Sequence, residues 1–249
     1  MNVRSRFSLA LACTMSLATV SVASADGTGD AEARFNTGVS HLREGRAALA
    51  LEEFKKAIKQ DPKNPYFHKG LGQAYAAQNR FKEAIDAFHK ALSLNPYYVD
   101  VRNDLGMALI SSGRREDGKK EFLAAFNDPT NPSPELTSFN LGSSYLDERD
   151  YAQAAEWFRT SLSRSKNAPS YYRLATSLQK LGKKEEAIAQ LESAVKEYPE
   201  NAPLLLSLGE AYYNVGRFGE ARDRLEDAAR KDPAGAGKRA SELLKHLPR

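Results

Sequence analysis

One repeating pattern accounts for most of this 249-residue chain. The segment GLGQAYAAQNRFKEAIDAFHKALSLNP at 70–96 matches SLGEAYYNVGRFGEARDRLEDAARKDP at 207–233 almost position for position. Successive copies start about 34 residues apart, and the six copies begin near Ala31, Pro65, Val99, Glu135, Ala168 and Ala202. A period of this length predicts a solenoid, because a small unit that cannot bury its apolar face alone must stack on its neighbours.

Each copy carries two apolar stripes of helical period, separated by a short polar turn that contains a residue such as Arg46 or Arg80. Small residues recur at fixed positions, which lets the two helices approach closely, and large apolar residues fill the remaining space. The eighth position of the repeat holds Gly38, Gly72, Gly106, Gly142, Ala175 and Gly209. A proline, which lacks the backbone N–H, follows the second stripe in four copies, as Pro62, Pro96, Pro199 and Pro233.

This pattern resembles the tetratricopeptide repeat (TPR) family over residues 31–235. The resemblance implies an all-α fold, an α-solenoid superhelix of six TPR helix-turn-helix repeats with a concave inner groove. Residues 236–249 are expected to form a C-terminal capping helix that lays Leu243, Leu244 and Leu247 against the last repeat.

The period is interrupted between the third and fourth copies. Two extra residues stand there, together with Pro129, Pro132 and Pro134. Because proline cannot continue a helix, we expect a bent joint at this point. Whether the groove is one site or two halves split at 129–134 stays open.

The resemblance also implies that the first helix of each repeat lines the groove, through its second, fifth, ninth, twelfth and thirteenth positions. These positions are mainly apolar and aromatic, which suits an extended peptide or an amphipathic helix and not the dicarboxylate clamp of some relatives. The alternative is that these side chains pack between repeats. We expect Phe35→Ala or Phe139→Ala to weaken partner binding and spare folding. The candidate groove residues are Phe35, Val39, Leu42, Tyr66, Lys69, Gln73, Asn103, Met107, Ile110, Phe139, Leu146, Tyr172, Leu206 and Tyr213.

No residue pattern in the chain matches a catalytic or cofactor-binding motif in full. The histidines at 41, 68, 89 and 246 form no i,i+4 pair. The segment GRREDGK at 113–119 matches a nucleotide-binding loop, but Lys120 stands where Ser or Thr would hold Mg²⁺. We expect no catalytic residue, cofactor or metal, and a non-enzymatic protein. The net charge of +4, without a basic block, argues against nucleic acid as a partner.

Residues 1–25 are expected to be a secretory signal. Two arginines precede an apolar run, and the ASA motif at 23–25 fits cleavage after Ala25. Export would make the protein periplasmic, with residues 26–30 as a flexible leader. The alternative is an outer-membrane lipoprotein acylated at Cys13, the one case in which we expect membrane contact.

The stretch 103–162 is similar to the third-to-fourth junction of the PilW/PilF/Tgl type of pilus-biogenesis proteins. The likeness rests on NDLG at 103–106, Pro134-Glu135 and NLG at 140–142. It implies a scaffold whose groove binds the type IV pilus secretin subunit and assists its assembly. The alternatives are another cell-envelope adaptor, which organises a cell-wall enzyme or a secretion complex, and an enzyme or regulatory subunit.

Overall fold

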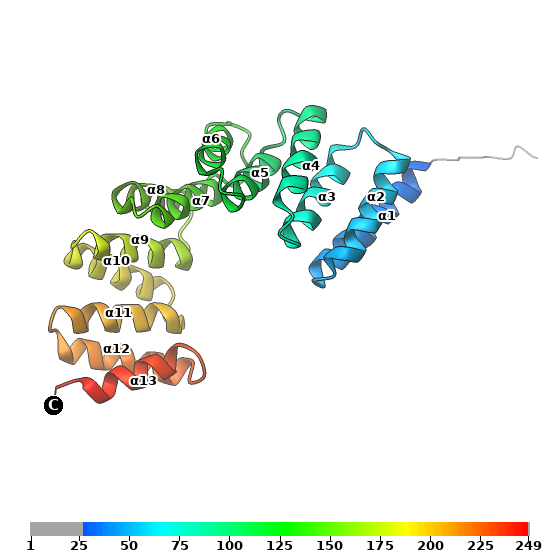
Figure 1. Cartoon of the computed structure of the whole chain (residues 1–249). Helices are drawn as coiled ribbons and strands as arrows, with labels where there is room; N and C mark the ends of the chain where they lie inside the picture. The colour runs from blue at the N-terminus through cyan, green and yellow to red at the C-terminus, as the bar shows by residue number, and fades with distance from the viewer. Residues whose placement is uncertain (1–26, 249) are drawn as a thin grey trace, which may run out of the picture.

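The computed structural model describes residues 27–248, and all the regular structure in that range is α-helical (Figure 1). The predicted all-α solenoid is confirmed. The helices are α1 (Gly27–Arg43), α2 (Ala47–Gln60), α3 (Pro65–Ala77), α4 (Phe81–Leu94), α5 (Val99–Ser111), α6 (Arg115–Phe126), α7 (Pro134–Asp147), α8 (Tyr151–Arg164), α9 (Ala168–Lys180), α10 (Lys184–Glu197), α11 (Ala202–Asn214), α12 (Phe218–Lys231) and α13 (Ala236–His246).

Only part of the predicted N-terminal region lies within the described residues. Helix α1 begins at Gly27, so residues 27–30 are helical and do not form the expected flexible leader. The predicted signal at 1–25, including Cys13, lies outside the described residues. Within residues 27–248, no helix is both long enough and apolar enough to cross a membrane.

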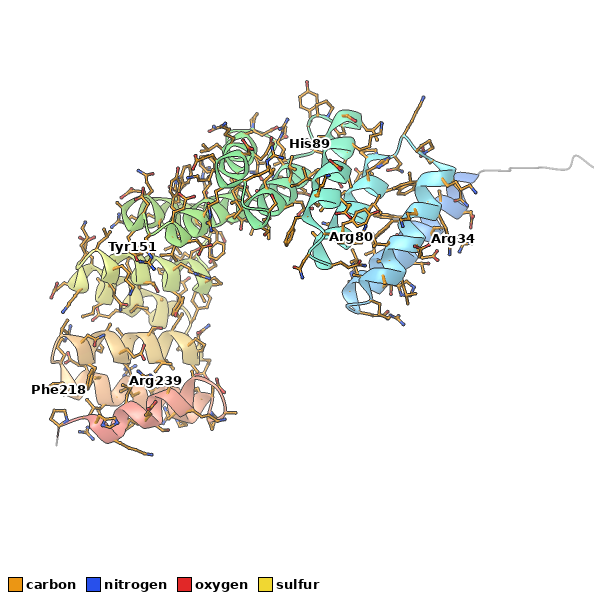
Figure 2. All side chains as sticks on the ribbon, viewed as in Figure 1. Arg34, Arg80, His89, Tyr151, Phe218 and Arg239 are labelled. Carbon is orange, nitrogen blue, oxygen red and sulfur yellow. The ribbon has the colours of Figure 1, made fainter. Side chains whose placement is uncertain are left out.

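Odd-numbered and even-numbered helices occupy different sides of the solenoid. Each odd-numbered helix contacts the next odd-numbered helix, whereas no pair of even-numbered helices does so within residues 27–248. The stack therefore curves with the odd-numbered helices inside, and the molecule is an arch (Figure 1). Figure 2 shows His89 of α4 and Tyr151 of α8 along its outer edge. The inner, concave face thus belongs to the first helix of each repeat.

Small residues at the eighth position of each repeat bring its two helices together. A Cβ built on Gly72 of α3 would lie 2.5 Å from the buried ring of Phe88 on α4. Gly38 meets Phe54 and Gly142 meets Phe158 in the same way. These rings fill the space that the missing side chains leave, so each of the first four repeats has its own aromatic plug, whereas Leu225 lies against Gly209 in the sixth.

The turns and helix starts follow the local chemistry of the chain. The residue two before each even-numbered helix has positive φ; it is glycine in four repeats and Asn79 or Arg149 in the others. Asn64, Asn167 and Asn201 begin α3, α9 and α11 by accepting a hydrogen bond from a backbone N–H, which a helix start cannot satisfy internally.

The proline-rich joint between α6 and α7 is braced by side chains. Asn131 donates through Nδ2 to the Ala125 carbonyl at 2.8 Å, which ties the joint to the end of α6. Lys119 of α6 reaches Glu148, the residue after α7, with 2.8 Å between Nζ and Oε2. Its ammonium also lies 4.7 Å from the ring centre of Tyr145. The joint is therefore a packed connection.

Helix α13 covers the open end of the last repeat, as expected for a capping helix. It contacts α12 and α11. Leu247 is buried, and Leu243 and Leu244 pack against the apolar core. Arg239 of α13, visible in Figure 2, lies with Nε 3.4 Å from Oε1 of Glu210 on α11.

Candidate functional site

Exposed apolar side chains gather on the odd-numbered helices of the inner face. Four large ones lie there: Tyr66 (54% exposed), Met107 (53%), Leu136 (51%) and Tyr172 (45%). Exposed aromatic and apolar groups that line a concave surface are typical of polypeptide-binding sites. Among the described residues, two further ones, Leu49 and Phe218, lie on even-numbered helices, and Tyr97 and Leu181 lie in turns.

The structure separates the predicted groove residues by exposure. Tyr66, Met107 and Tyr172 are exposed, and Asn103 is buried. The remaining ten are half-buried: Phe35, Val39, Leu42, Lys69, Gln73, Ile110, Phe139, Leu146, Leu206 and Tyr213. Eight of these ten are apolar or aromatic side chains that pack partly within the molecule. The other two, Lys69 and Gln73, bond to acidic groups of α5.

The half-buried rings belong partly to the core. The ring centre of Phe35 lies 5.6 Å from that of Phe54 and 5.3 Å from that of Phe67. Phe139 lies 5.6 Å from Phe158 in the same manner. Replacing either ring by alanine would remove core contacts, so the expectation that these substitutions spare folding needs correction.

Asn103 is too deeply buried for a partner to contact it. Its side chain is only 7% exposed, and its Oδ1 is buried without a hydrogen-bond partner in the described structure. Tyr172 and Asn103 both stand at the fifth position of their repeats, but Tyr172 is exposed and Asn103 is buried. Position in the repeat alone therefore does not decide exposure.

Polar bridges join α3 and α5 on the inner face. Gln73 donates through Nε2 to Oδ2 of Asp104 at 2.8 Å, and Nζ of Lys69 lies 3.5 Å from Oδ2 of Asp100. The rings of Tyr66 and Tyr98 meet edge to face, 5.2 Å apart. Burial raises the pKa of the Asp104 carboxyl, against the lowering effects of Lys69 and Gln73. A cavity of about 240 Å³ lies beside these groups, between α3, α4 and α5, with Met107 in its wall.

The C-terminal half carries four adjoining hollows. The largest, about 450 Å³, lies between the starts of α7 and α9 and the end of α8, and Leu136 and Phe139 line it. Three others, of about 240, 140 and 220 Å³, lie on the other side of α9, between α9 and α11, and Leu191 and Lys184 of α10 line the second and the third of them. Sequence reasoning missed Leu136 and Pro169, although both stand at the second position of their repeats.

The residues of the nucleotide-loop motif at 113–119 serve helix packing and ion pairs within the protein. Gly118 abuts the backbone of Gly106, which leaves no room even for a Cβ. The Lys119 ammonium pairs with Glu116 at 2.7 Å and with Glu148 at 2.8 Å. Within residues 27–248 no group of three His, Cys, Asp or Glu side chains is placed to hold a metal ion.

Family models match most of the described chain. A tetratricopeptide repeat model matches residues 22–65, 35–99 and 172–236, and a second one matches 76–136. A model of anaphase-promoting complex subunit 3 matches residues 123–194.

Individual relatives share the repeats over different lengths. The type IV pilus assembly protein PilF of Pseudomonas aeruginosa is 29% identical over 139 residues, covering 56% of this chain and 55% of PilF. The CTR9 homolog of Arabidopsis thaliana is 23% identical over 215 residues, covering 83% of this chain and 20% of that protein. The matched part is thus less than two thirds of either relative.

Solved structures share the fold at low identity. The crystal structure of PilW, a type IV pilus biogenesis factor, superposes with a TM-score of 0.72 at 19% identity, covering 85% of this chain and 98% of PilW. The structure of P. aeruginosa PilF gives 0.71 at 22% identity, covering 88% of this chain and 99% of PilF. The solenoid fold is therefore shared over nearly the whole of both solved chains.

Proposed function

Because the chain belongs to the tetratricopeptide repeat family, we propose that its concave face binds another polypeptide. The observation that carries this proposal is the exposure of Tyr66, Met107 and Tyr172 on the inner helices α3, α5 and α9. Amphipathic rings and flexible thioethers contribute strongly to protein interfaces, because they bury much area for little loss of conformational entropy. The function is that of a scaffold.

The partner that fits best is the secretin subunit of the type IV pilus. The similarity to PilF over 139 residues supports this assignment, and so does the fold shared with PilW over 98% of that chain. The N-terminal pattern at 1–25 supports export, which would place the arch in the periplasm, where a secretin is reachable. Acylation at Cys13 would instead anchor it to the outer membrane.

Affinity capture from solubilised envelopes tests the partner. We expect the wild-type protein to retain the secretin, and a triple variant Tyr66→Ser, Met107→Ser, Tyr172→Ser to lose it at least tenfold. A control, Leu49→Ser with Tyr97→Ser, removes apolar groups that are 48% and 80% exposed away from the inner helices, and it should retain the secretin. Capture of a different envelope protein by the same face would favour the adaptor alternative. Equal capture by both variants would refute binding on the inner face.

The anchoring question has a separate test. We expect no incorporation of labelled fatty acid into the protein and release of a fragment that begins at Asp26. Labelling that disappears in Cys13→Ser would establish the lipoprotein instead.

A further inference from the structure

The cavity beside Met107 is a hollow between α3 and α5, towards the ends of both helices, with a volume of about 240 Å³. Arg80, in the turn between α3 and α4, marks this end of the repeat in Figure 2. Phe88 of α4 and Ala108 of α5 are buried and form the floor of the hollow. Met107 and Ser111 are exposed and belong to its rim. The hollow therefore has an apolar floor and opens to solvent.

Asp104 is the only ionisable residue that lines this hollow in the described structure. Its carboxylate accepts a hydrogen bond from Nε2 of Gln73 at 2.8 Å. The nearby ammonium of Lys69 pairs with Asp100 instead, at 3.5 Å. Within residues 27–248, no lysine, arginine or histidine nitrogen lies within 4.0 Å of the Asp104 carboxylate. The acidic group at the hollow is thus held by a neutral amide and not by a cation.

The position of this carboxylate lowers the stability of the folded protein. Asp104 is half-buried, and burial raises the pKa of its carboxyl, with a further increase from the charge of Asp100. The ionised form is therefore disfavoured in the free protein, and a cation placed in the hollow would favour it again. A destabilised ionisable group at a hollow is typical of a binding site, where a residue serves recognition although it lowers stability.

A basic side chain suits this hollow better than an acidic or an apolar one. Lysine and arginine bury their aliphatic stems on apolar surfaces and keep the charged group at a polar edge. Phe88 and Ala108 provide such a surface, and Asp104 stands beside it. An acidic side chain would be repelled by the carboxylate. A purely apolar one would cover the carboxylate without offering a hydrogen bond, which is costly for a charged group.

We propose that this hollow receives a lysine or arginine side chain of the partner polypeptide, with its cationic group at the Asp104 carboxylate and its aliphatic stem against Phe88 and Ala108. This inference rests on the proposed function, because it specifies the chemistry of the partner at one point of the inner face. The partner therefore carries a basic residue at the point where it crosses α3 and α5.

Methyl NMR on the full-length chain tests the inference through one reporter. The chain contains three methionines, at positions 1, 15 and 107, and Met107 lies in the wall of the hollow. Its labelled methyl signal is assigned with Met107→Leu. The probes are hexapeptides GSGXGS with both termini blocked, in which X is lysine, arginine, norleucine or glutamate. We expect the lysine and arginine peptides to shift the Met107 signal saturably, at least fivefold more tightly than the norleucine peptide, and the glutamate peptide to leave it unchanged.

A pair of variants separates binding from folding. Asp104→Asn should weaken binding of the lysine and arginine peptides at least fivefold without lowering the melting temperature, so that unfolding cannot explain the loss. Asp86→Asn is the control, because it removes an exposed carboxylate from the outer helix α4, and it should leave the affinity unchanged.

The outcomes distinguish this inference from the broader function. Equal binding of the lysine and norleucine peptides, no shift of the Met107 signal by any peptide, or an unchanged affinity in Asp104→Asn would overturn the basic-side-chain assignment. Capture of the secretin by the inner face would still stand in each of those cases. Saturable binding of the basic peptides together with failed capture would support the assignment and refute the secretin as the partner.

Discussion

At the scale of single residues, the two helices of a repeat pack closely because one of them carries a glycine at the point of contact. Gly72 allows Phe88 to lie against the backbone of α3, and a Cβ there would come within 2.5 Å of the ring. Phe88 itself is buried between the helices, so it has little room to move. The aromatic plug and the glycine are thus one structural unit.

Gly72→Ala should therefore destabilise the protein although alanine favours helix. We expect a loss of about 1–3 kcal/mol in the free energy of unfolding from overpacking, measured by urea denaturation. Gly219→Ala is the matched control, since a Cβ there meets nothing within 4 Å and gains helix propensity. Equal effects in the two variants would contradict the packing explanation.

Substitutions of Phe35 and of Tyr66 are expected to affect stability and partner binding differently. Phe35→Ala removes contacts with Phe54 and Phe67 and should cost about 2 kcal/mol or more of stability. Tyr66→Ala removes a ring that is more than half exposed and should cost less than about 1 kcal/mol, while it weakens partner binding. Thermal melts and capture assays on both variants provide the comparison. The reverse order of stability loss would be inconsistent with the structure.

Asp104 makes part of the stability dependent on pH. Its pKa is raised in the folded protein, so the folded state holds the proton more tightly. That contribution is complete below the ordinary value of 3.8 and is lost as the pH rises through the folded pKa. Asp104→Asn should raise the melting temperature relative to wild type at pH 7, and the difference should shrink towards pH 3.5. A difference independent of pH would exclude this role.

At the scale of elements, Lys119 links α6 to α7 across the proline-rich joint. Burial by itself would lower the pKa of Lys119, but hydrogen bonds to Glu116 and Glu148 raise it on balance. Its side chain is 9% exposed, whereas that of the adjacent Lys120 is 76% exposed. The ammonium therefore stays charged within the contact between two repeats.

Lys119→Met should weaken that contact. We expect a loss of about 2 kcal/mol, because Glu148 is left partly buried without its partner. Hydrogen exchange should rise first in α6 and α7. Lys120→Met is the control and should change stability by less than about 0.5 kcal/mol. No difference between the two variants would mean that the joint does not depend on the ion pair.

Most element positions could be predicted from the sequence, because each repeat carries the same packing signals. Helices α3, α5, α9 and α11 begin where the period places a repeat start, and α7 begins one residue earlier. The extension of α1 to Gly27 could not be predicted, since GTGD carries no apolar stripe. Helical structure there follows from continuation of α1.

The inner face was harder to predict than the fold. A position in the repeat says which helix face a residue occupies, but its exposure depends on the neighbouring side chains. Phe35 packs against Phe54 and Phe67 and is half-buried, whereas Tyr172 packs against no other aromatic ring within residues 27–248 and is 45% exposed. Leu136 was identifiable from its place in the repeat and was overlooked.

At the scale of the whole molecule, the arch presents two halves of different character on one inner face. Between α3 and α5, Lys69 pairs with Asp100 and Gln73 donates a hydrogen bond to Asp104, so that both carboxylates have partners. Between α9 and α11, Gln179 and Asn214 line a hollow of about 220 Å³ together with Lys184 of α10. A partner bound along the arch would thus meet polar bridges in one half and a row of hollows in the other.

Site-specific photo-crosslinking in the intact envelope tests the central claim most directly. A photoreactive phenylalanine analogue replaces Met107 or Tyr172 on the inner helices, or Leu49 or Tyr97 elsewhere, in otherwise wild-type protein. We predict that the two inner positions crosslink to one polypeptide partner and that the other two do not. Crosslinks of the same partner from Leu49 and Tyr97, with none from Met107 and Tyr172, would contradict the account.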